Sequence, residues 1–375
     1  MRSSLNLYLS LICFFLDLIV ISAFQPLNVH PIPSSRVRSC LFVSTASTTQ
    51  PTELPDSLVD AAERAAESCA SFTEAAGPMA RCRVDFDTSA GDETFPILKT
   101  STEFMQNLVR FLSYRLVPGL QEMKQAEVQR VAEARVALQQ ILQQQEAGGE
   151  IDEEAKQKHI ATLENNGKDP EQIGKPWHGP VVRVYFPDEG NAALARRDWT
   201  TAATDLPPCV QFSSCGGVQI QDVSRDMVVF FFCPKASESD FVEELLRKTE
   251  SSAPNLLLTV FVNPNLVDMG VTGFGMAGRM LRERLLDGLT GTYYLRTLAW
   301  GALTRSWPNA YSIWQEDENS DGGYKLIRTL GYLPSNPEVE DIYDAANGGR
   351  GSGDGFSGGG PLDQLGDFVN GMMRL

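Results

Sequence analysis

The stretch Leu256–Trp300 decides the fold, and it reads LLLTVFVNPNLVDMGVTGFGMAGRMLRERLLDGLTGTYYLRTLAW. Its first seven residues are almost all Leu, Val or Phe without polar alternation, which is typical of a strand buried on both faces by helices. Asn263 and Pro264 end this strand, since proline has no amide hydrogen to give a sheet. We expect a glycine-rich loop, a helix over Arg279–Leu286 and a second strand before Trp300.

The glycine-rich loop contains the pattern G-x-G-x-x-G at Gly273, Gly275 and Gly278. In a dinucleotide-binding site the first glycine turns directly off the strand, and an acidic residue follows about 20 positions later. Here residues 263–272 separate the strand from Gly273, and Arg296 stands at the next strand in place of an acidic residue. We therefore favour a loop that passes close to its own sheet over a nucleotide site.

Further strands and helices alternate along the chain around this stretch. A helix over Leu58–Phe72 precedes a strand over Arg81–Asp87, whose alternating charged side chains indicate an edge strand. Strands are also expected at 181–186, 210–221 and 226–233, helices at 192–199 and 240–248, and an antiparallel meander over 302–307, 311–315 and 324–329. The sequence therefore predicts an α/β fold: a mixed, mostly parallel sheet with helices on both faces, Rossmann-like and three-layered, with an antiparallel extension near the C-terminus.

A polar helical hairpin interrupts this alternation. Gln121–Glu146 and Ile151–Asn166 are predicted to form two weakly apolar helices, and the hairpin is too polar to be buried. It either protrudes as a solvated pair or serves as an arm that pairs with a helix of a partner. We define one α/β domain over residues 53–346 with a helical insertion at 121–175, followed at 347–375 by a glycine-rich linker and a short amphipathic tail.

Residues 1–52 have the composition of a targeting sequence. The apolar run Leu5–Ile21 follows Arg2 and ends at small residues, as in a signal peptide. Phe24–Thr52 has no acidic residue and is rich in Ser, Thr and Pro, as in a transit peptide. The junction SAFQP at 22–26 resembles the signal–transit junction of algae with complex plastids, such as diatoms. We expect import into the plastid stroma of such an alga; secretion followed by a disordered spacer is the alternative.

Composition excludes several functional classes. Residues 1–52 hold one of the 48 acidic and three of the 32 basic side chains, so the remainder has a net charge of −18. Such a surface repels nucleic acid and anionic lipid, and no later stretch is long and apolar enough to span a bilayer. The remainder has two histidines and an odd number of cysteines, none spaced as C-x-x-C, which disfavours a triad, a metal site or a disulfide framework. Cys209 and Cys215 are left as a possible redox pair.

Polar side chains gather where strands of the predicted sheet end. Because ligands of open α/β sheets bind beyond the carboxyl ends of the strands, we select candidate ligand-binding residues there. These are Asp188, Asn263, Asp268, Arg279 and Arg296. Arginines beside carboxylates can bind a phosphate but also describe a structural ion-pair network, and Asp188 equally suits a helix cap. No catalytic residue, metal ligand or cofactor is predicted.

Three segments carry a resemblance to a known family: PDSLVDAAERAA at 55–66, VVRVYFPDEG at 181–190, and most of Leu256–Leu298. Residues from about 54 to 345 resemble the plant and algal plastid family of the domain of unknown function 1995. Its relatives include a stromal assembly factor whose loss lowers photosystem II accumulation, and the same module is appended to a plastid adenylate kinase. The resemblance implies a plastid location and a role in photosystem biogenesis, with no catalytic residues to carry over.

Two functional classes therefore stay open. The first, which we favour, is a non-catalytic plastid factor that binds photosystem subunits or other plastid proteins through the helical arm, the tail or the groove near Asn263. The second is an enzyme or binder of a small phosphorylated ligand or nucleotide at the carboxyl edge of the sheet.

Overall fold

A single mixed sheet organises the part of the chain that the computed structural model describes, namely residues 50–87, 94–146, 152–170, 173–200, 204–217, 221–266, 276–320 and 322–348. Its nine strands lie in the order β3-β2-β4-β5-β1-β6-β7-β8-β9. In chain order the strands are β1 (Ala80–Asp87), β2 (Val181–Phe186), β3 (Val210–Ser214), β4 (Asp226–Phe232), β5 (Leu258–Val262), β6 (Thr290–Leu298), β7 (Gly301–Ser306), β8 (Tyr311–Glu316) and β9 (Tyr324–Leu330).

The sheet confirms the predicted mostly parallel arrangement with an antiparallel extension. β3, β2, β4, β5, β1 and β6 pair in parallel, and β6 to β9 form the antiparallel meander. The prediction that β1 is an edge strand is wrong, because β5 and β6, both much later in the chain, pair on either side of it. Its charged residues therefore face one side of the sheet's centre.

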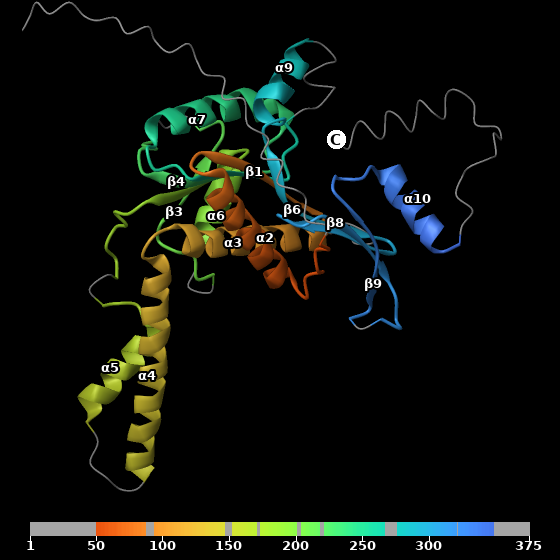
Figure 1. The fold of residues 1–375 in the computed structure, drawn as a ribbon. Coiled ribbons are helices and arrows are strands. Elements are labelled where there is room, and N and C mark those ends of the chain that lie inside the picture. The colour runs from red at the N-terminus through yellow and green to blue at the C-terminus, as the bar shows by residue number, and fades with distance from the viewer. Residues whose placement is uncertain are drawn as a thin grey trace, which may run out of the picture. The chain divides into compact units, whose positions relative to one another are not determined.

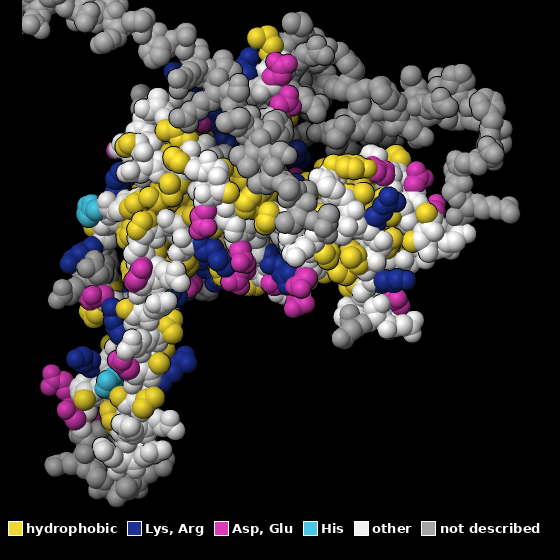
Figure 2. Space-filling model, in the orientation of Figure 1, with side chains coloured by type: hydrophobic (Ala, Val, Ile, Leu, Met, Phe, Trp, Pro, Cys, Tyr) yellow, Lys and Arg dark blue, Asp and Glu magenta, His cyan; other side chains and the backbone are white. Residues whose placement is uncertain are grey.

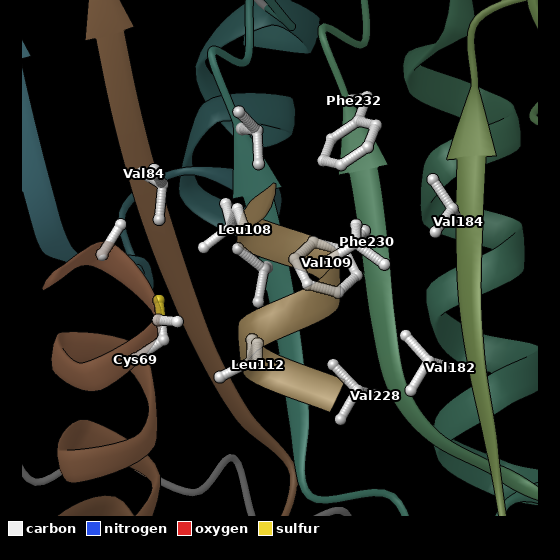
Figure 3. Close-up of a cluster of buried hydrophobic side chains, with 14 of the residues drawn as sticks. Cys69, Val84, Leu108, Val109, Leu112, Val182, Val184, Val228, Phe230 and Phe232 are labelled. Carbon is white, nitrogen blue, oxygen red and sulfur yellow. The ribbon is translucent and has the colours of Figure 1, made fainter. Parts of the chain in front are cut away.

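One face of the parallel region is covered by α2 (Leu58–Ala76), α3 (Thr94–Leu116) and α6 (Glu189–Asp198). Ser57 caps α2 by accepting a hydrogen bond from the Asp60 amide. Figure 3 shows valine and phenylalanine side chains of β1, β2 and β4 directed at Leu108, Val109 and Leu112 of α3. These side chains are removed from water, which supplies the main stabilisation of this layer.

The opposite face is covered by α7 (Ser239–Ser252) and α9 (Met276–Leu285), and the meander by α10 (Asn336–Ala346). A second buried cluster contains Val242 and Leu246 of α7 and Leu281 of α9. These side chains pack against Phe231 of β4 and Phe261 of β5, which alternate along their strands with the residues that face the first layer. Phe231 and Phe261 stack with 5.1 Å between ring centroids. Helices on both faces are thus confirmed, and the continuous apolar runs of β4 and β5 follow from this double coverage.

The predicted hairpin is present as α4 (Leu120–Glu146) and α5 (Glu153–Glu164), which lie side by side and extend away from the sheet (Figure 1). Gly119 makes the turn from α3 to α4 with a φ of +80°, a conformation that side chains disfavour. Gly167 packs after α5 so closely that an added Cβ would lie 2.1 Å from the Glu127 carbonyl oxygen. Gly119 therefore allows the turn between α3 and α4, and Gly167 allows the segment after α5 to pack against α4. We call α4 and α5 together the arm.

Several predictions lie outside the described residues. These are the targeting sequence up to residue 49, Asp268, Gly273, Gly275 and the tail from residue 349. Among the helices that are described, none combines the length and the apolar character that a membrane span requires.

Candidate functional site

Asp188, the first predicted ligand residue, is a helix cap. Its Oδ1 accepts a hydrogen bond of 2.8 Å from the Asn191 amide, and its Oδ2 accepts one of 2.7 Å from the Asn191 side chain. The carboxylate thereby satisfies the first turn of α6, where a negative charge is also favoured by the helix dipole. The structure thus supports the capping alternative at this position.

Asn263 extends the sheet beyond the last residue of β5. Its Oδ1 accepts from the Phe86 amide at 2.7 Å, and its Nδ2 donates to the Phe86 carbonyl at 2.8 Å. The backbone at Asn263 has a φ of +46°, a left-handed conformation that asparagine tolerates better than most residues. Both polar atoms of the side chain are engaged in joining β5 to β1, so Asn263 acts as a structural bridge.

Arg296 lies on β6, opposite Asp87 of β1. Its guanidinium donates to the Asn336 side chain at the start of α10, and it is partly buried. Arg279 belongs to α9 by its backbone, but its side chain and all of Asp268 are outside the described residues. Among the candidates whose side chains are described, Arg296 is the one cation, and the side chain to which it donates, that of Asn336, is neutral.

The described candidates do not converge on one crevice. Asp188 follows β2, Asn263 follows β5, and Arg296 is on β6. β4 separates β2 from β5, and β1 separates β5 from β6. At about 5 Å between neighbouring strands, Asp188 is about 10 Å from Asn263 and about 19 Å from Arg296 along the sheet. Analysis of the sequence missed Arg83 and Asp85 of β1, which face the same side as Arg296, because it placed them on an edge strand.

Cys209 and Cys215, which the sequence left open as a redox pair, are both free thiols. Cys209 precedes β3 and Cys215 follows it, so an extended strand of about 20 Å keeps them apart. Burial raises the pKa of each thiol to about 12. Cys69 and Cys82 are instead neighbours, with 3.7 Å between their sulfur atoms, but both are fully buried and burial raises the pKa of Cys82. A buried thiol with a raised pKa is unreactive, so these residues serve the core.

One side of α4 presents a row of exposed, uncharged side chains. Positions three or four residues apart stay on one side of a straight helix, and the exposed ones here carry no charge. We call these residues the uncharged stripe: Gln121, Gln125, Val128, Ala132, Val136, Gln139 and Gln143. Val128 and Val136 have 59% and 56% of their surface exposed. Figure 2 shows hydrophobic side chains at the surface along the arm.

A groove begins where the stripe meets the sheet domain. It has a volume of about 540 Å³ and opens between Phe111 and Tyr114 of α3 and the first turns of α4. Val128 and Ala132 of the stripe line it, and so does Lys124, whose ammonium pairs with Asp205 at 2.7 Å. The groove and the stripe together form one continuous surface of mostly uncharged side chains.

Comparison with known proteins identifies one relationship. The model of the family described as "Domain of unknown function (DUF1995)" matches residues 55–342, most of the chain. No curated protein and no solved structure gives a significant match.

Proposed function

The chain belongs to the family of the domain of unknown function DUF1995, and from that premise we propose that it is a non-catalytic factor that binds another protein through the arm. The single observation that carries this proposal is the uncharged stripe on α4. An exposed helix face that projects from its domain normally carries charges, which make solvation favourable. Here the face is built from glutamine, alanine and valine, so a partner can cover it without desolvating a charge.

The partner that suits this surface is an amphipathic helix. Small and uncharged residues at a helical spacing let a second helix approach closely, and glutamines exchange their bonds to water for bonds across the interface. Phe111 and Tyr114, at the base of the groove, offer aromatic surface where such a helix would end. Aromatic side chains at the centre of an interface commonly carry most of the binding energy.

The setting that we propose is the plastid stroma of an alga with a complex plastid, and the partners are photosystem subunits or other plastid proteins. The composition of residues 1–52 supports the location, and the family resemblance supports the link to photosystem biogenesis. A fusion of residues 1–52 to a fluorescent protein tests the location: it should enter the plastid, and retention in the secretory pathway would contradict it.

The test of partner binding compares two charged substitutions on exposed helices. Val128→Glu with Val136→Glu places charges in the stripe, and Leu194→Glu on α6, which is 49% exposed, is the matched control. Tagged full-length proteins are purified from the alga, and the co-purified proteins are quantified by mass spectrometry. We expect the double variant to lose its specific partners by about tenfold or more, since an interface must then desolvate two unpaired charges.

The control should recover the same partners as the unaltered protein. Circular dichroism and thermal unfolding should coincide for all three proteins, because the substituted side chains are exposed. Equal recovery of partners by the double variant and the unaltered protein would overturn the proposal.

A further inference from the structure

The centre of the sheet carries charged side chains on the face that α7 and α9 cover in part. β1 directs Arg81, Arg83, Asp85 and Asp87 to that face, while Cys82, Val84 and Phe86 face the other layer. Glu250 of α7 pairs with Arg81 at 2.5 Å and so neutralises the first of them. A charge that projects from a central strand must be desolvated in part, which is costly unless the site serves a purpose or is fully paired.

Arg83 and Asp85 form an incomplete pair. The Nε of Arg83 lies 2.8 Å from the Asp85 carboxylate, and 34% and 18% of the two side chains stay exposed. Among the described residues, the two terminal nitrogens of Arg83 have no hydrogen-bond partner. Each of these nitrogens can donate two hydrogen bonds, so the outward side of this guanidinium is available.

Tyr294 and Arg296 continue the same row on β6. Tyr294 is opposite Asp85 in the register, and Arg296 is opposite Asp87. The phenol of Tyr294 is within the influence of Arg296 and Asp85, and burial raises its pKa, so it stays protonated and can donate a hydrogen bond. Asn336 begins α10 and accepts a hydrogen bond from Arg296. The first turn of α10 holds Pro337 and the acidic Glu338, whose amide is already capped by Ser335, so this helix end is not part of the row.

These groups share one chemistry. Two arginines with unused donors and a phenol favour an oxyanion, and they occur in a chain with a net charge of −16. Asp85 adds a carboxylate beside them, which can accept a hydrogen bond from a hydroxyl group on the same ligand, and Asp87 lies on the same face of β1. The row combines donors for a phosphate with an acceptor for a sugar hydroxyl.

We infer that Arg83, Asp85, Tyr294 and Arg296 form a binding site for a phosphate ester on the face of the sheet that carries α7, α9 and α10. Arg83 and Arg296 bind the phosphate oxygens, and Asp85 accepts a hydrogen bond from a hydroxyl of the attached group. This site is independent of the arm. It differs from the predicted carboxyl-edge crevice, since Asp188 and Asn263 have no part in it.

Calorimetric titration of the full chain with inorganic phosphate and with ribose 5-phosphate tests the site at constant ionic strength. We expect ribose 5-phosphate to bind more tightly than inorganic phosphate. Arg296→Gln should weaken both by about tenfold to a hundredfold, the value of a charge-assisted hydrogen bond. Arg284→Gln is the matched control, because Arg284 is an exposed arginine paired with Glu243 on the same side of the protein.

The Asp85→Asn variant tests whether the site distinguishes a phosphate ester from inorganic phosphate. It should reduce the preference for ribose 5-phosphate and leave inorganic phosphate binding unchanged or stronger, since a negative charge is removed. Circular dichroism checks that each variant is folded. Absence of heat with both probes, or equal affinities of the Arg296→Gln and Arg284→Gln proteins, would overturn the inference.

Discussion

Arg183 on β2 and Arg296 on β6 point to the same face of one sheet, yet their surroundings differ. Arg183 is buried and makes a bidentate pair with Asp226, at 2.7 and 2.8 Å, with further bonds to Gln221 and the Asp222 carbonyl. Arg296 is partly exposed and bonds to neutral groups of Asn336 and Tyr294. Four of the five N–H donors of Arg183 are used within the fold, which marks it as structural, while unused donors mark Arg296 as available to a ligand.

The sheet centre and the arm both depart from the usual distribution of charge, in opposite directions. The sheet centre, where charges are costly, carries Arg83 and Asp85, whereas the exposed stripe of α4 carries none. Solvation alone would favour the reverse arrangement. We therefore interpret both regions as binding surfaces. The pair of Arg183 and Asp226 is the example of charged residues that stabilise the fold.

The largest expected effect breaks the saturated pair. Asp226→Ala leaves Arg183 buried without its carboxylate, and 4% of the Arg183 side chain is exposed, so water cannot replace the lost partner. We expect the free energy of unfolding to fall by about 3 to 5 kcal/mol. Urea denaturation followed by circular dichroism measures it. Arg284→Gln, which breaks an exposed pair, should cost at most about 1 kcal/mol; equal losses for the two variants would refute the distinction.

A smaller effect is expected at Asn263, another polar group whose bonds are saturated. Asn263→Ala removes both bonds to Phe86 and keeps a side chain at a φ of +46°. The expected loss is about 1 to 3 kcal/mol of unfolding free energy. Asn263→Gly, which relieves the backbone, should lose less than Asn263→Ala in the same denaturation experiment. If glycine costs as much as alanine, the left-handed backbone does not contribute.

The smallest effect concerns the pH dependence of the incomplete pair. Burial raises the pKa of Asp85 above its ordinary 3.8, so the folded state binds this proton more readily than the unfolded state. The contribution of Asp85 to stability is therefore greatest below pH 3.8 and is lost as the pH rises through the raised pKa. Relative to the unaltered protein, Asp85→Asn should gain stability across that window. Denaturation from pH 3.5 to 7 measures the difference between the two proteins; a difference constant with pH would contradict a raised pKa.

Much of the fold was predictable from local patterns. The apolar runs of β2, β4 and β5 indicated doubly covered strands, and the alternating segments indicated the meander, because burial on one or two faces leaves a direct record in residue order. The polar composition of residues 121–166 likewise indicated a hairpin outside the core. These features were predictable because the apolar or polar composition of a segment determines whether it is buried, whichever segments pack against it.

The position of β1 and the roles of the polar residues depended on the tertiary structure. Alternating charges on Arg81–Asp87 fit an exposed edge strand as well as a central strand with one polar face, and only the pairing with β5 and β6 distinguishes them. Asn263 and Arg296 resemble each other as polar groups near strand ends. Both polar atoms of the Asn263 side chain bond to the backbone of Phe86, whereas the Arg296 guanidinium keeps unused donors. The sequence alone determines which side chains must leave water. Which donors stay unpaired is a property of three-dimensional neighbours, since hydrogen bonds join residues far apart in the chain.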